Sequence, residues 1–259
     1  MYSQRRKILS QNFFHSRKLV ESLLRKSSIG KQDTVLEIGP GRGIITEQLL
    51  DRAGKVIAVE LDTNLYFYLR KKFFYAQRNL TLINKDILAY KLPTYPYKIF
   101  ANIPFSIEGK IVRQLLTASR PPQDCSLVMR KDLAERICAI KKECQFSIFY
   151  KPWFNFEIIH SFKKTDFEPY ARMETVLLRF YPKQAPLLSS IYQKQYMMFV
   201  GQGFGGGKRL KYNLRNFLSY EQCRRLSLQY NFDRNASPSE LNVEQWVGIF
   251  TWTLCGSSR

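Results

Sequence analysis

Acidic residues, histidines and paired cysteines are all scarce in this sequence. The 21 Asp and Glu residues stand against 41 Lys and Arg residues, and the only histidines are His15 and His160. The five cysteines are odd in number and scattered, and none forms a Cys-x-x-Cys pair. This pattern argues against a disulfide framework and against a zinc site, so we expect no metal and reduced thiols in the cytoplasm.

Long apolar runs are also missing. No run approaches the roughly 18 residues that span a bilayer, and residues 1–10 are basic but are not followed by the apolar segment of a secretory signal. We therefore expect no membrane partner. The chain has 259 residues, of which 45% are hydrophobic and 24% charged, and this composition fits a globular protein with a sizeable core rather than a disordered one.

The excess of basic residues gives a formal net charge of +20 and is spread along the chain. Residues 1–181 hold 31 Lys and Arg against 17 Asp and Glu, and residues 182–259 hold 10 against 4. This charge is well beyond what solubility needs, so it indicates a polyanionic partner. Nucleic acid is favoured over a membrane surface because no basic amphipathic anchor helix stands out.

Short β-rich runs alternate with helical stretches from about residue 31 to residue 179. Strands are expected at residues 34–38, 55–60, 80–84, 98–103 and 126–129, and helices at 44–52, 64–74 and 107–118. Residues 154–162 and 175–180 are further β-like runs that could pair as an antiparallel edge. The alternation predicts an α/β fold with a doubly wound, mostly parallel sheet. Past residue 182 the pattern turns helical, which predicts two domains, 1–181 and 182–259.

A glycine-rich turn joins the first expected strand to the first expected helix and reads Glu37-Ile-Gly-Pro-Gly-Arg-Gly43. Glycines let the backbone approach a ligand, and a helix N-terminus presents unpaired N–H groups. Alone, such a turn is a weak indicator, since many α/β proteins use one merely to turn. Glu60 at the end of the next strand strengthens it, because a carboxylate there can accept both ribose hydroxyls. The alternative for Glu60 is a surface glutamate at a strand end.

Two further strand ends complete a predicted crevice at the carboxyl edge of the sheet. Asp86 and Ile87 suit an adenine ring, with the carboxylate accepting from the exocyclic amine and the apolar side chain packing on the ring. Asn102-Ile-Pro-Phe105 offers an amide, a proline-stiffened backbone and an aromatic ring, which together suit a planar base that carries an amine. Taken singly, this tetrapeptide fits a strand-ending turn with a core Phe as well as it fits a base-binding site.

Together these motifs resemble those of the S-adenosylmethionine-dependent rRNA adenine N6-methyltransferases, the Erm and KsgA superfamily, over nearly the whole chain. The resemblance implies a Rossmann-like class I methyltransferase fold with a small C-terminal α-helical domain that assists RNA binding. It implies cofactor-binding roles for Gln11, Asn12, Phe13, Gly39, Gly41, Gly43, Glu60, Leu61, Asp86, Ile87 and Asn102. It implies target-base roles for Asn102, Ile103, Pro104 and Phe105, with Phe167 as a second base-stacking ring.

Several segments favour the Erm branch. Asn-Ile-Pro-Phe is the Erm form of the target-base motif, and Tyr150-Lys-Pro-Trp-Phe154 and the segment 238–246 also resemble Erm proteins. Ala171, Met173 and Arg130 depart from the family's usual Pro, Val and Gln. The resemblance implies methylation of an adenine in 23S rRNA before subunit assembly, by a monomer, with resistance to macrolides, lincosamides and streptogramin B. The alternatives are a KsgA-like 16S rRNA dimethyltransferase and a non-catalytic nucleic-acid-binding member of the fold.

Basic clusters are candidates for contact with the RNA backbone, although any single cluster is more often a solvated face. The candidates are Arg5, Arg6, Lys7, Arg17, Lys18, Lys141, Lys142, Lys163, Lys164, Lys208, Arg209 and Lys211.

Overall fold

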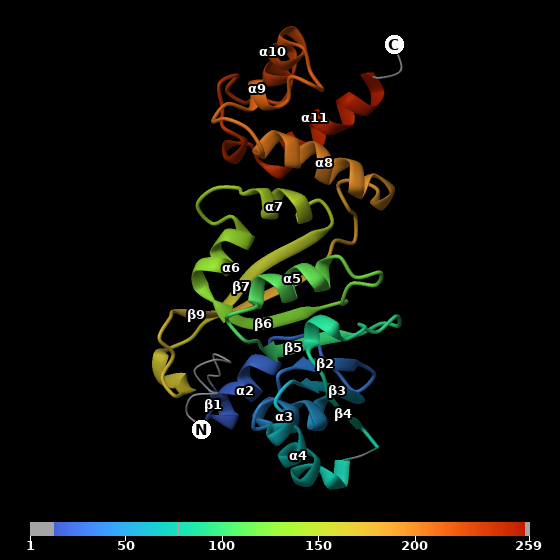
Figure 1. Ribbon diagram of the computed structural model, residues 1–259, viewed down its shortest axis with the longest axis vertical. Helices are drawn as coiled ribbons and strands as arrows, with labels where there is room; N and C mark the ends of the chain where they lie inside the picture. Colours follow the sequence, from blue (N-terminus) through green and yellow to red (C-terminus); the bar gives the residue numbers. More distant parts are fainter. Residues whose placement is uncertain (1–12, 77, 257–259) are drawn as a thin grey trace. The chain divides into compact units, whose positions relative to one another are not determined.

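The computed structural model describes residues 13–76 and 78–256 (Figure 1). Five residues with predicted roles lie outside this range, namely Arg5, Arg6, Lys7, Gln11 and Asn12. The chain folds into two compact units. One comprises residues 1–134 and 157–182, and the other comprises residues 135–156 and 183–259. These units differ from the predicted domains in the placement of residues 135–156.

A seven-stranded sheet with the order β4-β3-β2-β5-β6-β9-β7 is the framework of the fold. Its strands are β2 (Thr34–Ile38), β3 (Lys55–Glu60), β4 (Leu80–Asn84), β5 (Lys98–Asn102), β6 (Cys125–Arg130), β7 (Phe154–Ser161) and β9 (Thr175–Pro182). The pairs among β2 to β6 are parallel, and β9 runs antiparallel to β6. The predicted α/β, Rossmann-like sheet is therefore confirmed.

Helices follow the strands as the sequence pattern predicts. They are α2 (Arg17–Leu24), α3 (Ile44–Arg52), α4 (Thr63–Lys72), α5 (Glu108–Leu116) and α6 (Lys131–Cys138), with short 3₁₀ turns η1 (Phe74–Ala76), η2 (Ile87–Ala89) and η3 (Lys164–Asp166). Helix α4 begins where the Asp62 carboxylate accepts hydrogen bonds from the backbone N–H groups of Asn64 and Leu65. Apolar residues of α2, α3 and α4 join those of the strands in one buried core.

A small two-stranded sheet lies beside this core. Strand β1 (Phe13–Phe14) pairs antiparallel with β8 (Phe167–Glu168), so that Phe13 lies opposite Glu168 and Phe14 opposite Phe167. The Phe14 and Phe167 rings stack with their centroids 4.8 Å apart. This pairing ties the start of the described chain to a segment that is about 150 residues away in the sequence.

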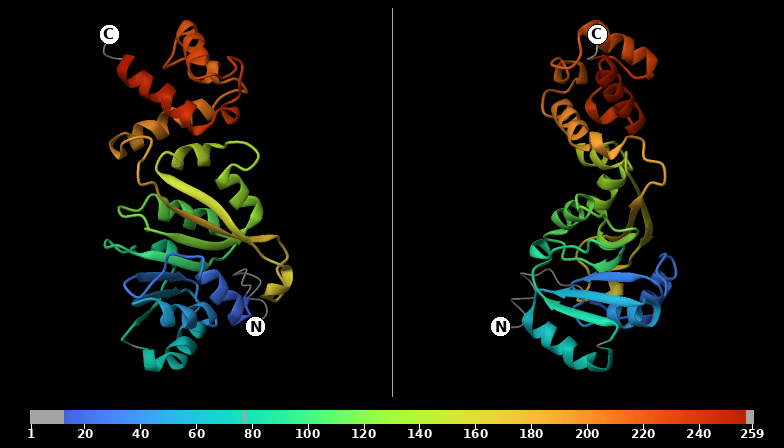
Figure 2. Two further views of the ribbon diagram at one scale, coloured as in Figure 1. Left: turned by 180° about the vertical axis from the view of Figure 1, so that it is seen from behind. Right: turned by 90° about the vertical axis from the view of Figure 1, so that its right-hand side faces the viewer.

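The second unit is helical, and its C-terminal part is orange to red in Figures 1 and 2. Its helices are α7 (Gln145–Tyr150), α8 (Gln193–Phe204), α9 (Leu210–Asn213), α10 (Tyr220–Gln229) and α11 (Val243–Gly256), with the 3₁₀ turns η4 (Ser190–Tyr192) and η5 (Pro238–Glu240). The fully buried Trp246 stacks on Phe204 at 5.5 Å and donates its indole N–H to the Pro238 carbonyl at 3.2 Å. The Erm-like segment 238–246 thus contributes its tryptophan to the core of this unit.

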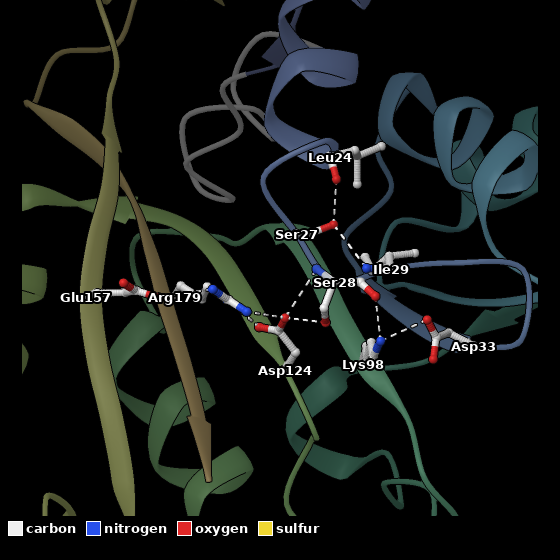
Figure 3. A network of polar contacts seen from close by, with 9 residues as sticks. All are labelled: Leu24, Ser27, Ser28, Ile29, Asp33, Lys98, Asp124, Glu157 and Arg179. Carbon is white, nitrogen blue, oxygen red and sulfur yellow. Dashed lines mark hydrogen bonds and ion pairs between the residues drawn. The ribbon is translucent and has the colours of Figure 1, made fainter. Parts of the chain in front are cut away.

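A polar network fastens the amino-terminal edge of the sheet (Figure 3). The Asp124 carboxylate, just before β6, accepts two hydrogen bonds of 2.9 Å from the Arg179 guanidinium on β9 and another from the Ser28 hydroxyl. Burial raises the pKa of Asp124, but these bonds outweigh it and hold the pKa below its usual range. Lys98 on β5 adds an ion pair of 2.9 Å with Asp33. Stabilising charges therefore gather at the edge away from the carboxyl ends of β5 and β6.

The described residues lack two kinds of feature. Among residues 13–76 and 78–256 no helix is long and apolar enough to cross a membrane. Within the same residues no group of three or more His, Cys, Asp or Glu side chains is arranged to hold a metal ion.

Candidate active site

A pocket opens at the carboxyl ends of β2, β3, β4 and β5, within the first unit. Its empty space of about 700 Å³ includes the open mouth of the pocket. The predicted residues that line it are Phe13, Gly39, Gly41, Glu60, Leu61, Asp86, Ile87, Asn102, Ile103, Pro104 and Phe105. Ile38, Val59, Lys85 and Ile107 also line it, and sequence reasoning missed them.

The glycine-rich turn has three residues in the left-handed conformation that glycine adopts without strain, at φ of 66°, 58° and 79° for Gly39, Gly41 and Gly43. A Cβ on Gly41 would lie 2.4 Å from the Phe13 ring, so its absence lets that ring form part of the pocket wall. Gly43 does not line the pocket. A Cβ there would lie 2.6 Å from Phe73 and 2.8 Å from Leu69, so this glycine allows the turn to pack closely on α4.

Glu60 is buried at the end of β3, with 4% of its surface exposed. One carboxylate oxygen accepts the Gly41 N–H at 3.0 Å, and the other accepts the Asp62 N–H at 2.9 Å. Burial raises the pKa of Glu60, and these backbone hydrogen bonds work against that effect. Each oxygen keeps a further lone pair, so the carboxylate can still receive two ribose hydroxyls. The alternative of a surface glutamate does not describe this position.

Glu37 lies in β2, two residues before Gly39, and is buried as well, although it does not line the pocket. Its Oε2 accepts the Thr46 hydroxyl at 2.7 Å, while Oε1 has no hydrogen-bond partner among the described residues. Burial raises the pKa of Glu37 to about 8, with the neighbouring Glu60 adding to the effect. Glu37 is therefore largely protonated at neutral pH in the folded protein.

Asp86 follows β4 at the next strand end. Its carboxylate accepts the Leu88 N–H at 2.9 Å and so begins the turn η2, which holds Ile87 in the pocket wall. Lys85 brings a cation to the same rim. No motif pointed to Lys85, because it is an ordinary lysine between two polar residues, and only the fold shows that it faces the pocket.

Asn102 is the last residue of β5, and Ile103, Pro104 and Phe105 continue the pocket wall. The Ile103 N–H donates to the Val128 carbonyl of β6 at 3.3 Å, and the Pro104 carbonyl accepts the Ile107 N–H at 3.2 Å. These bonds fix the backbone of the segment between the sheet and the start of α5. An amide, backbone carbonyls and a half-exposed ring therefore border the same pocket as Glu60 and Asp86.

Comparison with known proteins agrees with this geometry. Residues 2–254 match the family described as ribosomal RNA adenine dimethylase. The chain belongs to this family. It is therefore an S-adenosylmethionine-dependent methyltransferase of the Erm and KsgA type.

The relatives come from both branches of the family. An "rRNA adenine N-6-methyltransferase" of Bacillus anthracis is 29% identical, over 93% of this chain and 84% of the relative. A "Ribosomal RNA small subunit methyltransferase A" of Nostoc punctiforme is also 29% identical, over 93% of this chain and 92% of the relative.

Solved structures share the fold. The crystal structure of the 23S rRNA methyltransferase ErmE has a TM-score of 0.84 at 24% identity and covers 93% of this chain and 98% of that one. A dimethyladenosine transferase from Plasmodium falciparum has a TM-score of 0.78 at 18% identity, with the same coverage of both chains.

The pocket fits the adenosyl part of the family's cofactor. Such a ligand needs a buried carboxylate for the ribose, and a carboxylate and an apolar side chain for the adenine. Glu60, Asp86 and Ile87 supply these groups.

Arg130 is one of the departures from the family pattern, and the structure gives it a partner. It ends β6, and its guanidinium donates to the carboxylate of Glu108 at 2.6 Å, while its backbone N–H donates to the same carboxylate at 3.1 Å. Burial raises the pKa of Glu108, and the contacts with Arg130 oppose that shift. The pair ties the end of β6 to the start of α5, three residues after Phe105.

Phe167 does not lie in the pocket wall, where its predicted role of stacking on the target base would place it. Its side chain is fully buried in the core, stacked on Phe14 and edge-on to Phe162 at 5.4 Å. Pairing of β8 with β1 brings it there. Ala171, where the family usually has proline, packs into the same core, and Met173 is exposed. A base-stacking role for Phe167 stays a prediction that would require the ring to leave this core.

The described basic candidates lie on the surface of both units. Arg17, Lys18, Lys163 and Lys164 belong to the first unit, and Lys141, Lys142, Lys208, Arg209 and Lys211 to the second. The side chains of two of them form polar contacts with other residues of the chain. Arg17 forms an ion pair of 2.9 Å with Glu47, and Lys211 donates to the Asn235 side chain at 2.8 Å.

Proposed function

We propose that this chain methylates N6 of an adenine in 23S rRNA and thereby protects the ribosome from macrolides, lincosamides and streptogramin B. The observation that carries the proposal is the Erm form of the target-base motif, Asn102-Ile-Pro-Phe105, on the wall of a pocket that also holds Glu60 and Asp86. The Erm-like segments 150–154 and 238–246 support the same branch.

Positioning is the main task of the site, because the amine of adenine is conjugated with its ring and is a poor nucleophile. The side-chain oxygen of Asn102 and the carbonyl of Ile103 accept hydrogen bonds from the amine and so orient its lone pair. Bound S-adenosylmethionine supplies an electrophilic methyl group. Alignment of two reactants lowers a barrier by roughly 7–11 kcal/mol, so no strong general base is needed.

The adenine must leave its stack to enter the pocket, and Phe105 offers a ring that replaces part of the lost stacking. Such a contact contributes about 1–3 kcal/mol per base. An adenine that is already unpaired in a loop costs less to extrude. We therefore propose that the substrate presents its adenine in an unpaired element, on RNA that is not yet assembled into a subunit.

Expression in a macrolide-susceptible bacterium tests the proposal. We expect the wild-type gene to raise tolerance of a macrolide and of a lincosamide, and to place N6-methylated adenine in 23S rRNA. Asn102→Ala is the matched control, since it removes the acceptor that orients the amine. Unchanged tolerance together with unmethylated 23S rRNA would contradict the proposal.

A KsgA-like activity on 16S rRNA is the second candidate. It is favoured by the relative from Nostoc punctiforme, which is named as a small-subunit methyltransferase and is as similar in identity as the relative from Bacillus anthracis. Under this candidate the modified adenines would lie in 16S rRNA, and macrolide tolerance would not change.

A further inference from the structure

Helix α4 and the turn η1 carry an unusual set of exposed aromatic side chains. Phe67, Tyr68, Phe74 and Tyr75 expose 58%, 50%, 73% and 77% of their surface. They are four of the sixteen exposed large hydrophobic residues found among residues 13–76 and 78–256, and all four lie within nine consecutive positions. An exposed apolar cluster of this density costs solubility, so it calls for a partner. We call Phe67, Tyr68, Arg70, Lys71, Phe74 and Tyr75 the α4–η1 surface; α4 and η1 are cyan in Figure 2.

The fold itself does not require these rings. Leu69 and Phe73, on the opposite side of α4, are buried and hold the helix against the core. Helical residues three and four apart are neighbours, so Lys71 lies next to both Phe67 and Tyr68. The chain turns directly from α4 into η1, so Phe74 and Tyr75 follow one turn later. Lys71 thus lies beside one pair of exposed rings on α4 and precedes the second pair in the sequence.

The α4–η1 surface is built rigidly onto the cofactor site. Leu69 and Phe73 pack against Gly43 so closely that a Cβ there would collide with both. The Lys72 ammonium donates to the Arg42 carbonyl of the glycine-rich turn at 3.0 Å. The chain also enters α4 directly from Glu60 and Leu61, which line the pocket. A ligand on this surface is therefore held in a fixed position relative to the cofactor pocket.

Charge decides which partner fits. Residues 63–76 hold three Lys and Arg residues and no Asp or Glu, so a polyanion is attracted and a second copy of this face is repelled. Exposed rings interleaved with cations are the features that bind unpaired nucleic acid, because bases stack on the rings and phosphates meet the cations. Paired RNA hides its base faces and would leave the rings unused.

We propose that the α4–η1 surface binds an unpaired segment of the RNA substrate away from the methylated adenine. Phe74 and Tyr75 stack on bases, and Arg70 and Lys71 contact phosphates. The proposal rests on the proposed function only in taking RNA as the substrate. It adds an RNA contact on the face of the first unit formed by α4, which none of the basic clusters noted in the sequence includes.

The test is the affinity of the full-length protein for a single-stranded uridine oligonucleotide, measured by fluorescence anisotropy. The double variant Phe74→Ser with Tyr75→Ser should weaken binding about tenfold, since base–ring stacking is lost. The double variant Phe74→Trp with Tyr75→Trp should restore it. Tyr95→Ser and Ile191→Ser remove exposed apolar side chains elsewhere and should leave the affinity unchanged. Unchanged cofactor affinity in all variants shows that the fold is intact.

Three outcomes would overturn the proposal. In the first, the serine variant binds the oligonucleotide as the wild type does. In the second, it loses binding to vesicles of phosphatidylglycerol instead, and in the third it converts a dimer into a monomer. The last two would assign the surface to a membrane or to a second copy. Because the oligonucleotide contains no target adenine, the result does not depend on which rRNA is methylated, and a failure of the proposed 23S activity is recognised separately.

Discussion

At the residue scale, Asn102 is the side chain on which the proposed chemistry depends most. Replacement by alanine removes the oxygen that orients the adenine amine, while Glu60 and Asp86 stay in the pocket wall. We expect Asn102→Ala to lower the methyl-transfer rate by at least about 100-fold, as loss of a positioning contact does, with little change in RNA affinity. Single-turnover kinetics and a filter-binding assay measure the two separately. Normal turnover in the variant would remove Asn102 from the mechanism.

Glu37 makes the stability of the protein depend on pH. Its pKa is about 8 in the folded protein, against 4.5 for the ordinary side chain, so the folded state retains a proton that the unfolded chain releases. The resulting stabilisation is fully present below pH 4.5 and is lost as pH rises towards 8. Glu37→Gln should remove a slope on the order of 1 kcal/mol per pH unit within this window.

Urea unfolding of the wild type and of Glu37→Gln at a series of pH values measures this difference. The glutamine variant should gain stability relative to the wild type as pH rises from 5 to 8. Parallel curves for the two proteins would show that Glu37 is not protonated in the folded state.

At the scale of elements, the three glycines of the turn after β2 serve different purposes. Gly41→Ala would push Phe13 out of the pocket wall, so we expect cofactor affinity to fall about tenfold or more. Because alanine is strained at the positive φ of this position, the free energy of unfolding should fall by about 1 kcal/mol. Gly43→Ala would press on the buried Leu69 and Phe73, and such overpacking costs typically about 1–3 kcal/mol in addition to the backbone strain.

Titration calorimetry and urea unfolding of both variants separate the two roles. We expect the larger loss of affinity in Gly41→Ala and the larger loss of stability in Gly43→Ala. Equal effects on both quantities would mean that the turn acts as a single unit.

The same elements show how far the sequence alone leads. Five strands and the helix after β2 were predicted to within one residue of their observed bounds, because alternation and helical spacing are local signals. The pocket residues from four strand ends were predicted together, since parallel strands bring their carboxyl ends to one edge. Gly43 could not be assigned to packing, because that role depends on α4 lying across it.

Other features depend on pairing between distant segments, which a single sequence does not reveal. Phe167 was expected beside the base, but the pairing of β8 with β1 places it in the core. The partnership of Arg130 with Glu108 joins residues that are 22 positions apart. The grouping of residues 135–156 with the C-terminal helices likewise follows from tertiary contacts and not from composition.

At the scale of the whole molecule, the net charge of +20 should govern RNA affinity but not selectivity. Neutralised phosphates release counterions, so we expect RNA affinity to fall by roughly 10- to 1,000-fold between about 50 and 200 mM salt. Cofactor affinity should change little over the same range, because the Glu60 carboxylate is buried and salt screens buried charges less than exposed ones. Anisotropy and calorimetry at matched salt concentrations test this. A salt-independent RNA affinity would show that the charge plays no part in binding.

We propose above all that this chain uses the pocket to methylate an adenine of 23S rRNA. The most direct measurement is mass spectrometry of 23S and 16S rRNA, both as naked RNA and in assembled subunits, after reaction with the purified protein and S-adenosylmethionine. We expect N6-methylated adenine at one site in naked 23S rRNA and none in 16S rRNA. Methylation confined to 16S rRNA, or absent from both, would contradict the claim.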